Sequence, residues 1–149
     1  MKLLIDGDAL PNLLKPILFK AINKRAIKTI VVSNKKISIG NSEYIEYIIV
    51  EHGIDEADNH IVELIEKDDL VITADIPLAD RTVTKEAIAL NHRGELYTKE
   101  NIKHYLAMRN LMEEIRSTGE ITKGPAPFGK KDVEAFANGF YKYLDIVTK

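Results

Sequence analysis

The sequence predicts an α/β fold, a three-layer sandwich in which a mainly parallel sheet is flanked by helices. Three observations predict it. Short apolar segments alternate with longer amphipathic ones along the 149 residues, as in strands joined by crossover helices. The apolar segments are continuous, which is typical of strands buried on both faces. Polar residues, mostly aspartates, follow several of these segments, and open parallel sheets bind their ligands at that edge.

The apolar pattern gives the expected elements in order. The first half contains a strand at Leu3–Ile5, a helix over 13–22, strands at Thr29–Val32 and Tyr47–Val50, and a helix over Glu56–Glu66. The second half contains a strand at Leu70–Thr73, a partly helical segment over Ile76–Ala87, a short strand at Ile88–Leu90, a turn at Arg93–Gly94, a long helix from Thr98 to Ser117 and a final amphipathic helix over 133–144. Pro16 predicts a late or kinked start of the first helix. The segment Gly124–Phe128 is expected to be a rigid loop that closes over a site.

The composition fits one domain that spans residues 1–149. Hydrophobic residues make up 45% and charged residues 30% of the chain, which is enough apolar material for a core. The net charge is -2, so binding to nucleic acid would need a local basic surface. The absence of cysteine excludes thiolate catalysis and cysteine-ligated zinc. We expect a cytoplasmic protein without a membrane partner, because no signal peptide or membrane-length apolar run occurs.

Two aspartates end the first expected strand. In an extended segment Asp6 and Asp8 point to the same side, so their carboxylates can share one cation. Mg²⁺ or Mn²⁺ suits such an oxygen-only site. The alternative for Asp8 is that it caps the next helix. Taken alone, the pair favours neither interpretation.

A second pair of aspartates begins the helix expected over Glu56–Glu66. Asp55 and Asp58 there favour the helix dipole, which is a purely structural interpretation. Asp58 also shares a helical face with Ile61 and Ile65 and is expected to face the sheet. Because a buried carboxylate is costly without a cation or hydrogen bonds, this favours a functional role for Asp58 and not for Asp55.

Asp75 follows the clearest strand after one residue, Ala74, and Asp80 comes five positions later. Asp75 can be a simple turn residue, but Asp6, Asp58 and Asp75 are all expected at one edge of the sheet. Carboxylates gathered there would repel one another without a counter-ion. The sequence therefore predicts a Mg²⁺ or Mn²⁺ site whose metal ligands are Asp6, Asp58, Asp75 and Asp80, and whose catalytic residues are Asp6, Asp8, Asp58 and Asp75.

Four further residues are candidates for substrate binding. Ser33 and Asn34 end the second strand at the same edge. Arg93 is either a phosphate contact or part of a hairpin turn. Arg109 is either a phosphate contact or the partner of Glu113 four residues on. A Ser-His-Asp triad is not indicated, because Ser33 lacks a G-x-S-x-G context.

These acids are compatible with two mechanisms. In the first, metal ions held by the aspartates activate water for hydrolysis of a phosphodiester. In the second, Asp6 is the nucleophile of a phosphatase and Asp8 its acid and base, because an apolar strand ending in D-x-D resembles the first motif of the haloacid dehalogenase superfamily. Ala9 and Ala74 depart from that superfamily's motifs, and no lysine can be assigned. A non-catalytic metal- or nucleotide-binding protein is the third possibility.

The chain as a whole resembles the YaiI/YqxD family of bacterial proteins. The similarity rests on Asp6–Pro11, Asp55–Asn59, Leu70–Ala79, Leu90–Thr98, Gly124–Phe128 and Phe136–Asn138. Gly7 and Leu10 depart from the family's usual alanine and cysteine. That family looks like a relative of PIN-domain nucleases, and Asp6, Asp58 and Asp75 match the positions of their acids. The resemblance implies a PIN-like domain and a metal-dependent nuclease that acts on RNA or a small nucleotide.

Overall fold

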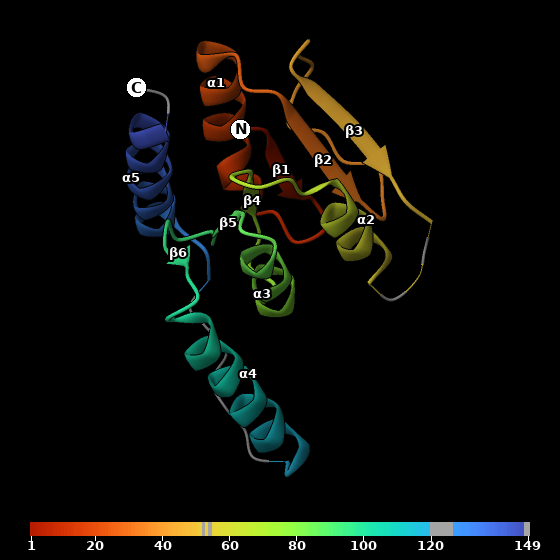
Figure 1. The fold of residues 1–149 in the computed structure, drawn as a ribbon, viewed down its shortest axis with the longest axis vertical. Helices are drawn as coiled ribbons and strands as arrows, with labels where there is room; N and C mark the ends of the chain where they lie inside the picture. Colours follow the sequence, from red (N-terminus) through yellow and green to blue (C-terminus); the bar gives the residue numbers. More distant parts are fainter. Residues whose placement is uncertain (52, 54, 120–126, 148–149) are drawn as a thin grey trace.

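The computed structural model describes residues 1–51, 53, 55–119 and 127–147, in which strands and helices alternate (Figure 1). The strands are β1 (Leu3–Asp6), β2 (Thr29–Ser33), β3 (Ile45–Ile49), β4 (Leu70–Ile72), β5 (Ile88–Leu90) and β6 (Leu96–Tyr97). The helices are the 3-10 turn η1 (Asn12–Leu14), α1 (Lys15–Arg25), α2 (Glu56–Leu64), α3 (Ile76–Thr84), α4 (Ile102–Ser117) and α5 (Lys130–Val147). The start of the first helix is irregular as Pro16 predicts, since η1 precedes α1.

The strands form one sheet in the order β3-β2-β1-β4-β5-β6. Every pair from β3 to β5 is parallel, and only β6 is antiparallel, to β5. The turn at Arg93–Gly94 joins these last two strands, with Gly94 at φ 82°. β6 has two residues, too few for a period-2 pattern, which is why the sequence did not predict it.

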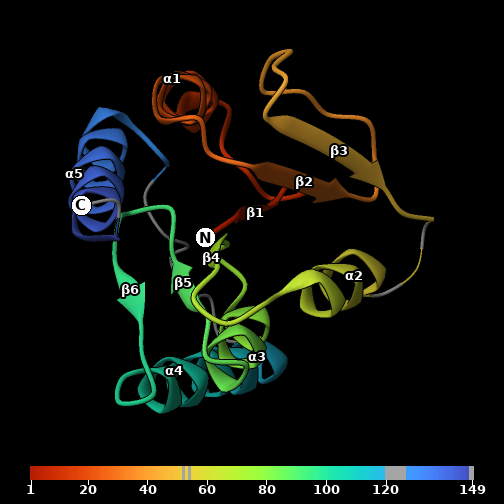
Figure 2. The ribbon, with the colours of Figure 1, turned by 45° about the horizontal axis from the view of Figure 1, so that its top comes forward.

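Helices cover both faces of the sheet (Figure 2). Leu3 and Ile5 of β1 pack with α1 and α5, whereas Leu4 between them packs with α2 and α3. All three side chains are fully buried, as expected for a strand with helices on both sides. This arrangement confirms the predicted α/β fold with a mainly parallel sheet.

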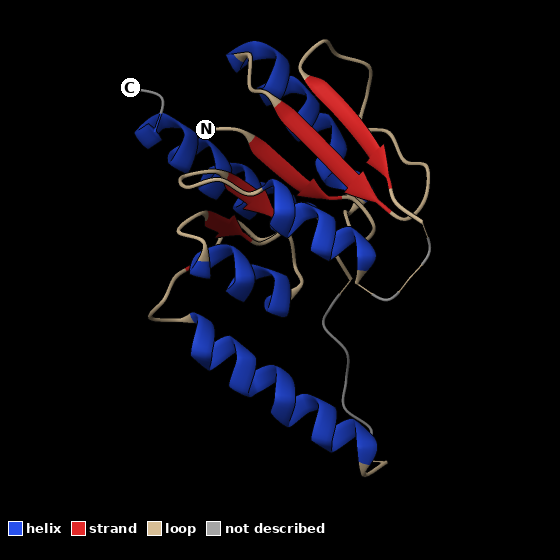
Figure 3. Cartoon of the chain, turned by 45° about the vertical axis from the view of Figure 1, so that its right-hand side comes forward, coloured by secondary structure: helices blue, strands red, loops and turns tan. Residues whose placement is uncertain are grey.

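Helix α4 lies outside these layers, beyond α3 (Figure 3). It is anchored at its start, where Ile102 packs with Ala79 and Val83 of α3. No helix among the described residues is long and apolar enough to span a membrane. Of the expected loop Gly124–Phe128, residues 124–126 lie outside the described part of the chain, so its role stays a prediction.

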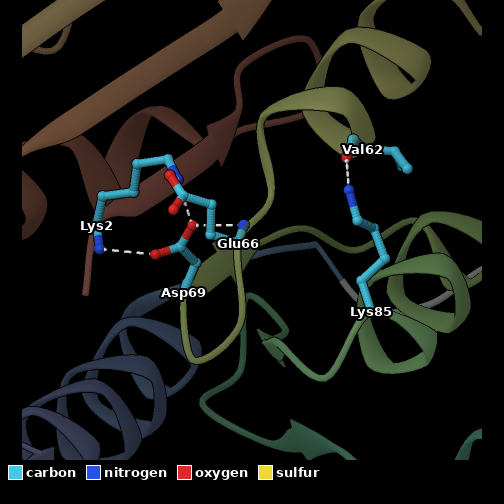
Figure 4. A network of polar contacts seen from close by, with 5 residues as sticks. All are labelled: Lys2, Val62, Glu66, Asp69 and Lys85. Carbon is cyan, nitrogen blue, oxygen red and sulfur yellow. Dashed lines mark hydrogen bonds and ion pairs between the residues drawn. The ribbon is translucent and has the colours of Figure 1, made fainter.

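A polar network fixes the amino ends of β1 and β4 (Figure 4). The Asp69 carboxylate accepts hydrogen bonds from the backbone N–H groups of Lys2 at 3.0 Å and Glu66 at 2.8 Å, and it also binds the Lys2 ammonium group. Burial opposes ionisation of Asp69, but these donors keep its pKa below the usual range. The network therefore joins the two central strands at their amino ends, opposite the edge of the sheet at which Asp6 ends β1.

Candidate functional site

A pocket of about 350 Å³ lies at the carboxyl ends of β1, β2 and β4, beside the first turn of α2. Six of its nine lining residues have polar side chains, and the other three are alanines. The pocket is lined by Asp6, Asp8, Ala9, Asn34, Asp55, Ala57, Asp58, Ala74 and Asp75. The structure therefore brings Asp6, Asp8, Asp58, Asp75 and Asn34 together, as the rule for strand ends leads one to expect. It also adds Asp55, whose side chain forms no capping hydrogen bond, to the lining.

Asp6, the last residue of β1, is only 5% exposed. One of its carboxylate oxygens, Oδ2, accepts a hydrogen bond from Thr73 Oγ1 at 2.9 Å. Burial raises the pKa of Asp6, the Thr73 hydroxyl counteracts this, and the charges of Asp75 and Asp8 raise the pKa further. Asp6 is thus a recessed carboxylate whose ionised form lacks a compensating cation among the described residues.

Asp75 has two roles at the junction of β4 and α3. It is the N-cap of α3, and its Oδ1 accepts a hydrogen bond from the backbone N–H of Leu78 at 2.9 Å. Its own backbone N–H donates to Thr73 Oγ1 at 3.0 Å. Helix capping and lining of the pocket are therefore compatible, and Thr73 holds Asp75 and Asp6 in a fixed relation.

Asp58 reaches the pocket from the first turn of α2 and is half-buried. Burial, followed by the negative charges of Asp75, Asp6 and Asp55, raises its pKa to about 6, against a lowering influence from Arg81. Carboxylates from three separate elements thus act on one another electrostatically. A bound cation would relieve this repulsion.

Asp8 does not cap the helix that follows it. The N-cap of η1 is Pro11, without a side-chain capping bond. Instead, Oδ1 and Oδ2 of Asp8 accept the backbone N–H of Asn34 at 2.8 and 3.1 Å. The Asn34 side-chain oxygen is buried and has no hydrogen-bond partner among the described residues. The capping alternative for Asp8 is therefore wrong, because this carboxylate joins the end of β1 to the end of β2.

The other candidate residues lie elsewhere. Asp80 lines a separate hollow between α3 and the start of α4, because the turn of α3 carries it away from Asp75. Arg93 forms an ion pair with Asp132 at 3.0 Å, and Arg109 forms one with Glu113 at 3.1 Å. The Ser33 hydroxyl donates to the backbone carbonyl of Lys35 at 2.5 Å. None of the four lines the aspartate pocket.

Arg81 is a polar residue near the pocket that the sequence analysis missed. Its Nη1 donates to Asn59 Oδ1 at 2.8 Å, so it lies beside the turn of α2 that carries Asp58. No spacing in the sequence brings residues 59 and 81 together. Only the packing of α2 beside α3 does so.

The donor chemistry of the pocket fits a hard divalent cation. Carboxylate and amide oxygens are the ligands that Mg²⁺ and Mn²⁺ prefer, usually with several waters retained. In the described part of the chain, no group of three or more His, Asp or Glu side chains is arranged so that it could hold an ion. Direct coordination by three aspartates would therefore require their side chains to approach one another.

Comparisons with known proteins point to a single family. The model of a family described as "Uncharacterized BCR, YaiI/YqxD family" matches residues 4–146. A UPF0178 protein of Sulfurimonas denitrificans is 65% identical over 144 residues, which are 97% of this chain and 95% of that protein. A UPF0178 protein of a Nitratiruptor species is 58% identical over 149 residues, covering 100% of this chain and 98% of that protein. No solved structure gives a significant match.

Proposed function

The chain belongs to the YaiI/YqxD family, and we propose that it is a Mg²⁺- or Mn²⁺-dependent nuclease that hydrolyses phosphodiester bonds in RNA. The observation that carries the proposal is the convergence of Asp6, Asp58 and Asp75 on one pocket. These residues come from β1, α2 and the β4–α3 junction. Ligands bind at this end of an open parallel sheet, and this position supports the assignment of the catalytic centre to the pocket.

In this proposal Asp6, Asp58 and Asp75 hold the metal. When bound, one or two divalent cations would activate a water molecule and stabilise the leaving oxygen. Thr73 orients Asp6 through its hydroxyl group. Asp8, fixed by the Asn34 backbone, would orient the attacking water. Asp80 has no part in this mechanism, since it lies in another hollow.

The choice of RNA rests on the resemblance to PIN domains. The segment from Thr73 to Asp75 also resembles a T-x-D strand motif of PIN domains, and here the Thr73 hydroxyl contacts both the Asp6 side chain and the Asp75 backbone. A threonine in this motif thus has a structural role, because its hydroxyl group links Asp75 to Asp6 on the neighbouring strand. This supports the PIN-like assignment of the domain, which is also part of the proposal.

The phosphatase alternative receives less support from the pocket. The haloacid dehalogenase pattern includes a lysine, and the described residues that line the pocket include no lysine or arginine. Asp6, the would-be nucleophile, is 5% exposed, with one oxygen bound to Thr73. A hydrolase that uses metal-activated water needs no such accessible nucleophile.

The test offers labelled single-stranded RNA and a generic phosphomonoester to the protein with Mn²⁺, with Mg²⁺ and with EDTA. The proposal expects cleavage of RNA that requires the metal, falls at least ~100-fold in Asp6→Asn and Asp75→Asn, and is unchanged in the matched control Asp80→Asn. Hydrolysis of the phosphomonoester alone, with a beryllofluoride adduct at Asp6, would establish the phosphatase instead. Metal binding without turnover of either substrate would indicate a binding protein.

A further inference from the structure

The described lining of the pocket offers a nucleic acid neither a stacking surface nor a positive charge. Its described lining consists of aspartates, Asn34 and alanines, without an aromatic ring or a cation. Proteins hold single-stranded nucleic acid by stacking its bases on aromatic side chains and by placing cations along its backbone. A metal ion held by the aspartates would allow the pocket to accept one phosphodiester group, and the affinity for the rest of the substrate would come from groups outside the pocket.

Two such groups follow Asn34 directly. Lys35 and Lys36 are exposed, and neither takes part in an ion pair among the described residues. Their loop is fixed beside the pocket by the hydrogen bond from the Asn34 backbone to Asp8 and by the bond from the Ser33 hydroxyl to the Lys35 carbonyl. The two ammonium groups therefore extend from an anchored backbone.

The same loop packs directly on the segment between Asp6 and Asp8. A Cβ atom added to Gly7 would lie only 2.6 Å from Cδ1 of Ile37 and 3.2 Å from Cβ of Ser33. The loop and the Asp6–Asp8 segment are therefore closely packed. It also means that alanine at position 7, the residue usual in the family, would require Ile37 to shift in this chain.

Arg81 provides a cation on the other side. It is exposed on α3, and its guanidinium group binds the neutral Asn59 side chain instead of a carboxylate. In the sheet, β1 lies between β2 and β4, so the loop after β2 and the helix after β4 lie on opposite sides of Asp6. Adjacent strands are about 4.8 Å apart, and β2 and β4 are therefore separated by about 10 Å at the floor of the pocket.

We propose that the substrate is a single-stranded oligonucleotide whose backbone crosses the pocket, with phosphates bound by Lys35 and Lys36 on one side and by Arg81 on the other. This inference rests on the proposed nuclease function. The recessed position of Asp6 requires the scissile phosphate to enter the pocket, which a flexible single strand can do and a duplex backbone cannot. Recognition through phosphates alone makes binding independent of base sequence and dependent on strand length.

The experiment measures binding of fluorescent RNA strands of two, four, eight and twelve nucleotides to the full chain in Ca²⁺, with salt titrations. The variant Lys35→Glu/Lys36→Glu is compared with Lys20→Glu/Lys24→Glu, a matched change of charge at exposed positions of α1 that do not line the pocket. Loss of two phosphate contacts is expected to weaken the binding of the longer strands at least ~10-fold and to reduce the salt slope by about 1.4. Arg81→Glu is also expected to weaken the binding of the longer strands. The control variant Lys20→Glu/Lys24→Glu is expected to bind them as tightly as the unchanged protein does.

The inference is overturned if dinucleotides bind as tightly as the longer strands, if duplex RNA binds more tightly than single strands, or if both double variants bind alike. Cleavage is measured on the same proteins to separate this inference from the proposed function. Metal-dependent cleavage that persists in Lys35→Glu/Lys36→Glu with an unchanged dependence on strand length would contradict the inference and leave the nuclease proposal standing. Length-dependent binding without cleavage in any metal would support the inference and contradict the nuclease proposal.

Discussion

The Thr73 hydroxyl donates a hydrogen bond to the Asp6 carboxylate across 2.9 Å, fully inside the protein. The two residues are 67 positions apart in the chain, and the bond joins the ends of the neighbouring strands β1 and β4. The same hydroxyl oxygen accepts the backbone N–H of Asp75. One hydroxyl group thus sets the relative positions of two of the three carboxylates to which we assign the metal.

Thr73→Val is expected to destabilise the fold and weaken the site together. Valine keeps the shape of threonine but leaves the Asp6 oxygen and the Asp75 N–H without this partner, which typically costs about 1–3 kcal/mol. Urea unfolding measures the loss, and Thr73→Ser is the control, since it retains the hydroxyl. A Thr73→Val protein as stable as Thr73→Ser would show that the hydroxyl does not hold the two strand ends.

Asp58→Asn is expected to stabilise the protein at neutral pH. The folded-state pKa of Asp58 is raised to about 6 from its ordinary value of 3.8. Protonated Asp58 therefore contributes fully to the stability of the fold below pH 3.8, and this contribution is lost as the pH rises through 6. Because the side chain is partly solvated, we expect a gain of only about 1 kcal/mol at pH 7.5. Urea unfolding of both proteins at pH 4 and 7.5 should show a difference at the higher pH alone. A difference of equal size at both values would contradict the assigned cause.

His92 is expected to make the protein less stable in acid. Burial, with a smaller contribution from the Arg93 charge, lowers its pKa from 6.5 to about 4, and its Nε2 is buried without a hydrogen-bond partner among the described residues. Neutral His92 contributes fully to the stability of the fold above pH 6.5, and this contribution is lost as the pH falls toward 4. Between pH 7.5 and 5 the free energy of unfolding should fall by about 2 kcal/mol. In His92→Gln the loss of stability between pH 7.5 and 5 should be smaller by about 2 kcal/mol. In the control His104→Gln, at an exposed position of α4, the loss should equal that of the unchanged protein. Equal losses in the two variants would exclude His92 as the cause.

Most of the fold could be predicted from the sequence, because its buried strands are continuous apolar runs. The boundaries differ by a few residues where no local signal marks them. The third strand begins at Ile45 instead of Tyr47, and α3 ends at Thr84 instead of near Ala87. The antiparallel strand β6 was not predicted, because a strand of two residues is too short to show a period-2 pattern.

The sequence indicated the pocket through its strand ends but could not choose among side chains farther along the chain. Asp6 ends β1 and Asp75 directly precedes α3, so the topology of the sheet places them. The direction of the Asp80 side chain depends on the position of the residue around the axis of α3, and Asp80 lines a hollow beside the start of α4. The role of Arg81 depends on a contact between two helices. Arg93 and Arg109 have carboxylate partners, and only the Glu113 partner of Arg109 was visible as an i, i+4 spacing.

Above all, we propose that Asp6, Asp58 and Asp75 form a binding site for a divalent metal ion. Calorimetric titration of Mn²⁺ into the protein tests this most directly, with Asp6→Asn, Asp75→Asn and the matched control Asp80→Asn compared at pH 7.5 after circular dichroism has confirmed that each is folded. We predict that the unchanged protein and Asp80→Asn bind Mn²⁺ alike, and that Asp6→Asn and Asp75→Asn bind it at least ~10-fold more weakly. Equal binding by all four proteins, or no binding by the unchanged protein, would contradict the proposed site.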